Sequence, residues 1–139
     1  MKTIDSKELS LEACIEMFNA AKAKADEIGF KIALTIVDTG GNTKFFARMD
    51  GGALVACDIS RKKAVTAVGF GIPTGNGGWY DFIKGDPILE NGVSNIKDFM
   101  LLGGGKPISI DGQLVGAIGI SGGHYTQDEA CCDAALAIL

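Results

Sequence analysis

The stretch KIALTIVDTGGNTKFFARM, residues 31–49, decides the fold class of this chain. Residues 31–38 are rich in β-branched side chains and apolar on both faces, which is typical of a strand in the middle of a sheet. The tetrad TGGN then supplies turn residues, and residues 43–49 return as a second strand. Two adjacent strands joined by a tight turn form a hairpin, so the sheet is expected to be antiparallel.

Helices are predicted on both sides of this hairpin. Over residues 10–28 apolar side chains recur at spacings of three and four, with Ser10 as the N-cap and Gly29 just past the end. A second helix is predicted over 54–68. A final helix is predicted from about residue 127 to the end, because Thr126 and Glu129 form a T-x-x-E capping box.

A second group of strands is predicted in the C-terminal half. The stretches are FMLLGGG (99–105), KPISI (106–110) and QLVGAIGIS (113–121), with an Asp-Gly turn at 111–112. Residues 69–98 are rich in glycine and are predicted as an irregular loop with a short helix near 79–84. This order indicates one domain over 1–139 of the α+β class, with helices packed on an antiparallel sheet of about five strands.

The composition narrows the range of functions. The 139 residues are 47% hydrophobic with a formal net charge of −4, so the chain lacks the basic footprint that nucleic acids and anionic membranes require. No apolar run approaches the roughly 20 residues of a membrane span. The first residues lack the apolar region of a signal peptide. The four cysteines include no C-x-x-C pair, so reduced thiols and a cytoplasmic location are expected.

The junction between the last strand and the last helix is the first candidate site. Gly122 and Gly123 let a ligand approach the backbone, and the amides at the helix start favour an anion, so a carboxylate or phosphate could bind there. His124, the only histidine, follows directly. It is a candidate axial ligand to the metal of a haem or corrinoid, or an acid–base group. The alternative is an ordinary surface histidine beside a tight turn.

The first hairpin carries a second set of polar residues. Asp38 ends one strand and Asp50 follows the other, which turn chemistry alone could explain. Arg48 can pair through two nitrogens with a carboxylate. That carboxylate is either one of these aspartates or a propionate of a ligand.

Three motifs resemble the GlcG/HbpS family, also called the haem-degrading domain family, and the C-terminal domain of PduO-type corrinoid adenosyltransferases. They are TIVDTGGNTKFFARMDGG (35–52), SRKKAVTA (60–67) and LLGGGKPISIDGQLVGAIGISGGHYTQDEA (101–130). The resemblance implies a profilin-like fold and a homo-oligomer built from dimers. It also implies binding of haem or cobalamin, as in some members. Haem-binding members use histidines elsewhere, including the first helix, where this chain has none, so ligation of iron would rest on His124.

The resemblance also assigns residues to a ligand site. Glycine-rich features of the family fall on Gly103, Gly104, Gly105, Pro107, Gly119, Gly122 and Gly123. Polar features fall on Asp38, Arg48, Lys63, Gln127, Asp128 and Glu129. The site is expected between loop 121–128 and loop 70–85, with Trp79 and Tyr80 as a flat apolar wall.

Two classes of function are open. One is a small-ligand-binding or accessory protein that takes haem, a corrinoid or a small carboxylate in a glycine-rich site between subunits. The other is an enzyme that acts on a small oxo or hydroxy acid, with His124 as the acid–base group.

Overall fold

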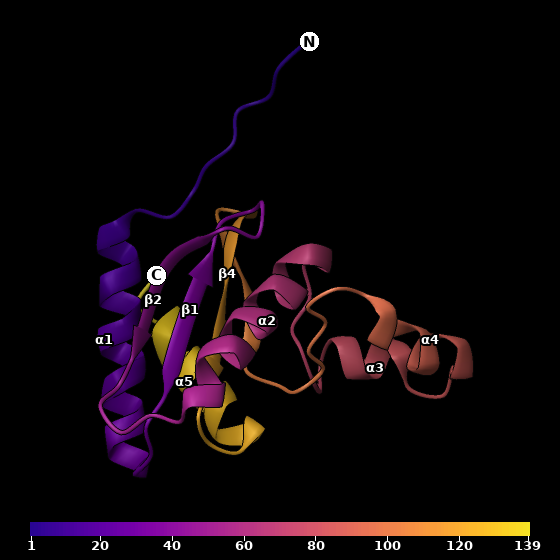
Figure 1. The fold of residues 1–139 in the computed structure, drawn as a ribbon. Coiled ribbons are helices and arrows are strands. Elements are labelled where there is room, and N and C mark those ends of the chain that lie inside the picture. Colours follow the sequence, from indigo (N-terminus) through magenta and orange to yellow (C-terminus); the bar gives the residue numbers. More distant parts are fainter.

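The structure is a computed structural model that describes residues 1–139, and it contains a four-stranded antiparallel sheet with helices on both faces (Figure 1). In chain order the elements are α1 (Leu11–Ile28), β1 (Ala33–Val37), β2 (Thr43–Arg48), α2 (Leu54–Phe70), α3 (Trp79–Ile83), α4 (Pro87–Gly92), the 3₁₀ helix η1 (Val93–Asn95), β3 (Gly105–Ile110), β4 (Gln113–Ser121) and α5 (Tyr125–Leu136). The strand order is β2-β1-β4-β3, so two hairpins are joined by the pairing of β1 with β4. The predicted α+β class and antiparallel sheet are confirmed.

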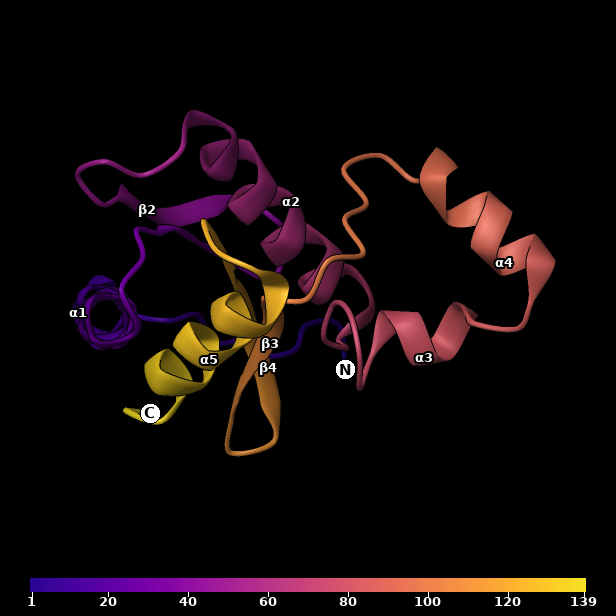
Figure 2. The ribbon, with the colours of Figure 1, turned by 90° about the horizontal axis from the view of Figure 1, so that it is seen from below.

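Strand β1 is buried along its whole length because helices cover both faces of the sheet. Leu34 and Ile36 belong to a cluster of 16 buried apolar residues that also includes side chains of α1 and α5. Val37 packs instead with Ala64 and Ala67 of α2. Figure 2 shows α1 and α5 on one side of the sheet and α2 on the other. The central position predicted for this strand is therefore confirmed.

Helix α2 packs directly on the backbone of β3 and β4 because the facing positions are glycines. A Cβ atom at Gly119 would overlap the carbonyl oxygen of Ser60, and one at Gly105 would overlap the carbonyl oxygen of Lys63. This close approach places Lys63 against the end of β4, next to the start of α5.

Residues 71–104, called the arm below, leave the end of α2 and project away from the sheet (Figures 1 and 2). The arm holds α3, α4 and η1, and its own core consists of Trp79, Ile83 and Val93. The short helix predicted near 79–84 is confirmed as α3, whereas α4 and η1 were not predicted. Neither the arm nor the rest of the chain contains a helix with the length and apolar character that crossing a membrane requires.

The prediction of a strand over 99–105 is wrong, which leaves the sheet with four strands rather than five. The backbone around this segment is irregular and hydrogen-bonds to α2 instead of to a strand. Asp98 takes a left-handed conformation with φ 63°, and the N–H of Met100 donates to the hydroxyl of Thr66 at 2.9 Å. The ladder of β3 begins only at Gly105.

Helix α5 begins two residues earlier than predicted. Its N-cap is His124, whose Nδ1 accepts a hydrogen bond from the N–H of Thr126, and Gln127 completes the capping box by accepting from the N–H of His124. The predicted box formed by Thr126 and Glu129 is therefore wrong, because the histidine ring itself takes the capping position. His124 does lie just outside the helix, as predicted.

Candidate functional site

Two neighbouring cavities open where the arm meets the first turn of α5. The larger one, called the arm cavity below, has a volume of about 430 Å³. The second, called the junction cavity, has a volume of about 370 Å³ and lies between α2, the end of β4 and the start of α5. Leu102 and Tyr125 line both cavities, so the two are adjacent. Both volumes fall in the range of small-molecule sites in proteins.

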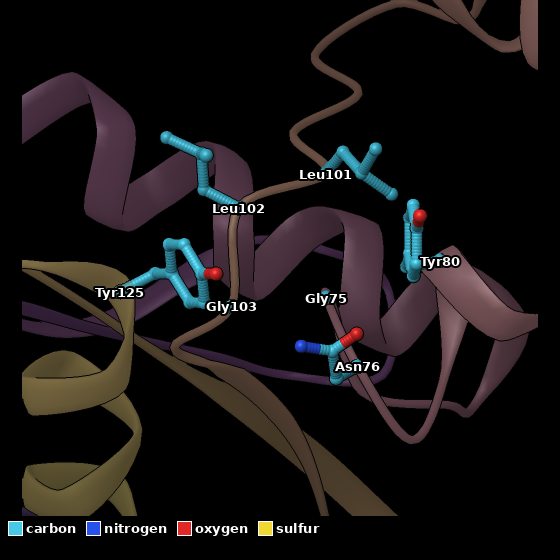
Figure 3. Close-up of a pocket in the computed structure, with 7 residues that line it drawn as sticks. All are labelled: Gly75, Asn76, Tyr80, Leu101, Leu102, Gly103 and Tyr125. Atoms are coloured by element: carbon cyan, nitrogen blue, oxygen red, sulfur yellow. The ribbon is translucent and has the colours of Figure 1, made fainter.

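The arm cavity has aromatic and apolar walls. Figure 3 shows Tyr125 and Leu102 on one side, with Leu101 and Tyr80 on the other and the side chain of Asn76 below them. These two tyrosines are the only ones in the chain. A flat ligand can pack against their rings, while the amide of Asn76 offers both a donor and an acceptor.

Glycines at the base of the arm cavity let the neighbouring segments approach one another closely. A Cβ atom at Gly75 would overlap Gly103, and one at Gly103 would overlap the carboxylate of Glu129. Glu129 Oε1 is buried there without a hydrogen-bond partner. A buried carboxylate oxygen that lacks a partner repels a second carboxylate and favours a hydrogen-bond donor, so this side of the site does not suit an anionic group.

The junction cavity contains the only histidine, and its ring is fixed on several sides. Nδ1 of His124 lies 2.8 Å from the hydroxyl oxygen of Thr126 and 3.2 Å from the backbone nitrogen of the same residue. The ring packs against that of Tyr125 at a tilt of 35°, with a centroid distance of 4.1 Å. Replacing a good N-cap residue with alanine typically costs about 1 kcal/mol, so this ring also stabilises the start of α5.

A buried ion pair forms the floor of the junction cavity. Lys63 Nζ donates to Asp128 Oδ2 at 2.8 Å and to the carbonyl oxygen of Ile120 at 2.8 Å, and both charged side chains are 2% exposed or less. The other carboxylate oxygen, Oδ1, accepts from the N–H of Gly123 at 3.0 Å. Burial raises the pKa of Asp128, and the charge of Lys63 with the two hydrogen bonds opposes that rise. The pair therefore fixes the glycine turn that precedes His124.

The amides that the sequence offered as an anion site are already paired within the chain. The N–H of Gly123 donates to Asp128, and that of His124 donates to Gln127 at 2.9 Å. The N–H of Thr126 donates to the histidine ring. These three groups do not form an open cradle, so any anion in this cavity has to be held by side chains.

Trp79 does not form the wall that was predicted. It is 8% exposed, lies in the core of the arm, and donates from its indole nitrogen to the carbonyl oxygen of Thr66 at 3.2 Å. Its ring packs edge-on against Phe99 and Phe82. Of the predicted aromatic pair, only Tyr80 lines the arm cavity. Trp79 and Tyr80 face different sides of α3 because consecutive residues of a helix point about 100° apart.

The hairpin residues Asp38 and Arg48 lie at opposite ends of the β1–β2 hairpin. Asp38 accepts hydrogen bonds from Asn42 and Gly40 within the turn, which hold its pKa below the ordinary value. The turn explanation for Asp38 therefore suffices. Arg48 is opposite Ala33, which in turn is opposite Ser121, so it lies at the same end of the sheet as the junction cavity, two strands away.

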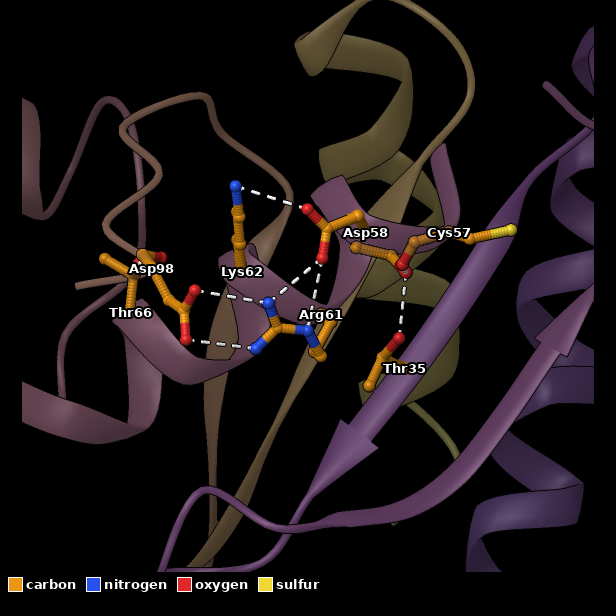
Figure 4. Close-up of polar contacts among 8 residues, drawn as sticks. Thr35, Cys57, Asp58, Arg61, Lys62, Thr66 and Asp98 are labelled. Carbon is orange, nitrogen blue, oxygen red and sulfur yellow. Dashed lines mark hydrogen bonds and ion pairs between the residues drawn. The ribbon is translucent and has the colours of Figure 1, made fainter. Parts of the chain in front are cut away.

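A polar network that sequence reasoning missed attaches the arm to α2 (Figure 4). Arg61 donates to both carboxylate oxygens of Asp98 at 3.1 and 3.2 Å and also pairs with Asp58 at 3.0 Å. The carbonyl oxygen of Asp98 accepts from the hydroxyl of Thr66. Arg61, Lys62 and Lys63 are consecutive in the sequence, but Arg61 clamps the arm and Lys63 is buried.

The cysteines do not contribute a nucleophile to the site. All four are free thiols, and Cys14, Cys131 and Cys132 are buried. Burial raises the pKa of Cys131 to about 11, so its thiol stays protonated at neutral pH. Cys14, Cys131 and Cys132 belong to the cluster of 16 buried apolar residues.

Comparison with known proteins places this geometry in a family. The family model described as "Haem degrading protein HbpS-like" matches residues 9–137. A 15.0 kDa protein encoded in the dhaT-dhaS intergenic region of Citrobacter freundii is 35% identical over 92% of this chain and 89% of its own length.

Two solved structures extend the comparison to three dimensions. An HbpS double mutant from Streptomyces reticuli superposes with a TM-score of 0.87 and 30% identity, over 99% of this chain and 91% of that one. The PduOC–haem complex superposes with a TM-score of 0.84 and 28% identity, over 95% of each chain. The predicted resemblance to the GlcG/HbpS family is confirmed.

Proposed function

We propose that this chain, which belongs to the HbpS-like haem-degrading protein family, is a binding protein for a flat tetrapyrrole such as haem or a corrinoid. The single observation that carries the proposal is the adjacency of the arm cavity and the junction cavity around Leu102 and Tyr125. The complex of PduOC with haem shows that a relative of this fold accepts such a ligand and supports the proposal.

The walls of the two cavities fit a macrocycle. Tyr80, Tyr125, Leu101 and Leu102 supply the apolar contact area, and His124 lines the junction cavity next to Tyr125. A tetrapyrrole that spans both cavities would bury its ring between these side chains and leave its substituents near the turn at Gly123. Bound haem would supply an iron centre whose reactivity depends on its axial ligands and the polarity around it.

A second copy of the chain is part of this proposal. Leu54 and Val55, at the start of α2, are 80% and 65% exposed, and Val55 lines the junction cavity. Exposed apolar residues at the mouth of a cavity favour coverage by another protein surface. We therefore propose that a homo-oligomer completes the site, and that light scattering at micromolar concentration gives a multiple of the 14.4 kDa chain mass.

The test is a titration of the full chain with haem and, separately, with cobalamin, followed by absorbance. Tyr80→Ala is expected to weaken binding about tenfold because it removes one wall of the arm cavity. Phe82→Ala is the matched control, since Phe82 lies on the same short helix and is similarly exposed but does not line either cavity. Absence of saturable binding of both ligands to the wild-type chain would overturn the proposal.

The second candidate function is an enzyme that acts on a small oxo or hydroxy acid. The observation that favours it is the fixed ring of His124, stacked on Tyr125 and held by Thr126. A ring held in one orientation at a cavity is suited to acid–base work. Two- and three-carbon hydroxy and oxo acids can be incubated with the chain and followed by proton NMR, and turnover that disappears in His124→Ser would support this candidate.

A further inference from the structure

The hydrogen bonds of His124 determine which of its ring nitrogens carries the proton. A neutral imidazole has one donor nitrogen and one acceptor nitrogen. Nδ1 of His124 lies 3.2 Å from the backbone nitrogen of Thr126 and 2.8 Å from its hydroxyl oxygen, and the hydroxyl can either donate or accept. The backbone N–H can only donate, so the cap bond of α5 requires Nδ1 to accept and Nε2 to carry the proton. Nε2 makes no hydrogen bond within the chain.

A metal needs the opposite arrangement. Iron or cobalt binds the lone pair of Nε2, which requires the proton to move to Nδ1. Nδ1–H would then donate to the hydroxyl oxygen of Thr126 and would no longer accept from the backbone N–H of that residue, so the bond by which His124 caps α5 would be lost. An oxygen acceptor on a ligand requires no such change, because Nε2–H is already a donor.

The charges around the two cavities also favour a ligand carboxylate in the junction cavity, next to His124. Asp128 is the one acidic residue that lines the junction cavity, and both of its oxygens are paired, with Lys63 and with the N–H of Gly123. The junction cavity therefore contains no uncompensated negative charge. Beside the arm cavity, in contrast, Glu129 Oε1 is buried without a partner and would repel an anion.

We propose that His124 donates from Nε2–H to a carboxylate of the ligand and does not ligate a metal. The carboxylate end of the ligand lies in the junction cavity, and its apolar body lies in the arm cavity between Tyr80 and Tyr125. This inference rests on the ligand site proposed above. The carboxylate can belong to a tetrapyrrole propionate or to a small acid, and the experiments below separate the two sources.

The proton position is measured first, on the ligand-free chain. Because His124 is the only histidine, a long-range ¹H–¹⁵N correlation spectrum contains the signals of a single imidazole. At about pH 9, above the ordinary titration range of histidine, the expected pattern is a protonated Nε2 and an unprotonated Nδ1. A protonated Nδ1 would overturn the inference whatever the chain binds.

The role of the imidazole is measured second, with His124→Ser. Serine is a preferred N-cap and forms a capping box with Gln127, so this variant removes the ring and keeps the cap. The probes are haem, metal-free protoporphyrin IX and protoporphyrin IX dimethyl ester. We expect His124→Ser to weaken the binding of haem and of protoporphyrin IX by a similar factor of about ten. The dimethyl ester should bind more weakly to the wild-type chain, and its affinity should not respond to the substitution.

Three other outcomes decide the matter as clearly. If His124→Ser shifts the Soret band of bound haem and leaves protoporphyrin IX unaffected, the ring ligates iron and the inference is overturned. If no tetrapyrrole binds, the tetrapyrrole proposal fails, and glycolate becomes the probe. Glycolate that perturbs the His124 signals and binds about tenfold more weakly to His124→Ser supports the inference with a small acid as the source. Glycolate without either effect overturns it.

Discussion

The sheet with its three long helices and the arm are stabilised in different ways. The sheet region is organised around one cluster of 16 buried apolar residues, whereas the arm has a core of three, Trp79, Ile83 and Val93. The arm is held to α2 by the packing of Phe70 on Trp79 and by directional polar contacts. These are chiefly Arg61 with Asp98 (Figure 4) and the carbonyl oxygen of Thr66 with the indole of Trp79. A small core with few apolar contacts opens more readily than a large one.

This difference bears on the site because the two regions meet there. The arm contributes Tyr80, Leu101 and Leu102 to the cavities, and the sheet region contributes Lys63 and Asp128. We expect the arm to open locally more readily than the sheet region, which holds the ion pair and the cap of α5. Trp79, the only tryptophan, lies in the arm, so its fluorescence reports the arm while circular dichroism reports the whole fold.

The largest effect is expected for Lys63→Met, in the sheet region. It leaves the carboxylate of Asp128 buried without its cation, and breaking such a pair typically costs about 3 to 5 kcal/mol. The free energy of unfolding in urea should fall by this amount whether it is followed by tryptophan fluorescence or by circular dichroism. Lys62→Met, which removes only an exposed pair with Asp58, is the control and should change stability by less than about 1 kcal/mol. A double change, Lys63→Met with Asp128→Leu, should recover most of the loss, and failure of the single change to destabilise would contradict the account.

A medium effect, confined to the arm, is expected for Ile83→Ala. Ile83 is 3% exposed, and truncation of a buried isoleucine costs about 2 to 5 kcal/mol. Because the arm core is small, we expect the lower end, about 2 kcal/mol. The tryptophan fluorescence midpoint in urea should fall while the circular dichroism midpoint changes less. Ile88→Ala, at a position that is 84% exposed on α4, should leave both unchanged. Equal shifts of both signals would mean that the arm and the sheet unfold as one unit.

A smaller effect is expected for Arg61→Gln, which removes the clamp between α2 and the arm. Charged hydrogen bonds that are partly exposed contribute about 1 kcal/mol, so the fluorescence midpoint should fall by a corresponding amount. Amide exchange in the arm should also become faster. Asp58→Asn is the matched control, because Asp58 pairs with Arg61 on the α2 side only. If the two variants behave alike, the pairing with Asp98 does not hold the arm.

The smallest effect is a pH dependence of the same clamp. The hydrogen bond from Arg61 holds the pKa of Asp98 below its ordinary value. The unfolded chain therefore binds this proton more readily than the folded chain, so the clamp contributes fully above the ordinary aspartate pKa of about 3.9 and is lost as pH falls through the lowered folded value. Acid should thus shift the fluorescence midpoint of the wild-type chain. In Asp98→Asn this contribution to the acid dependence should be absent, and an unchanged acid profile would rule the clamp out as its cause.

Much of the sheet region was predictable from local patterns. The apolar faces of residues 31–38 predicted a central strand, and the repeats of three and four over 10–28 predicted α1 with its Ser10 cap. The segment 99–105 was misread because its apolar and glycine residues have the composition of a strand. The N–H of Met100 donates instead to the hydroxyl of Thr66 on α2, a residue distant in sequence, which no local pattern reveals.

The candidate site was predictable in part. The sequence marked His124, Tyr80 and the turn at Gly123, and the structure brings all three to two adjacent cavities. It placed Trp79 on the wrong side of α3, because a five-residue helix is too short for its apolar face to be read from periodicity. The resemblance assigned Lys63 and Asp128 to the site, but only the structure shows that these residues, 65 apart in the sequence, form a buried ion pair.

The sequence by itself determined the class of the fold, the hairpins, the long helices and the family, because these depend on short-range periodicity and on motifs that are contiguous in the chain. Only the tertiary structure decided how the polar groups are used. Lys63 is buried because Gly105 and Gly119 let α2 approach the sheet. Nδ1 of His124 accepts from the N–H of Thr126 because the ring caps α5. Both outcomes depend on which donors and acceptors folding brings within about 3 Å of one another, and the order of the residues does not contain that distance.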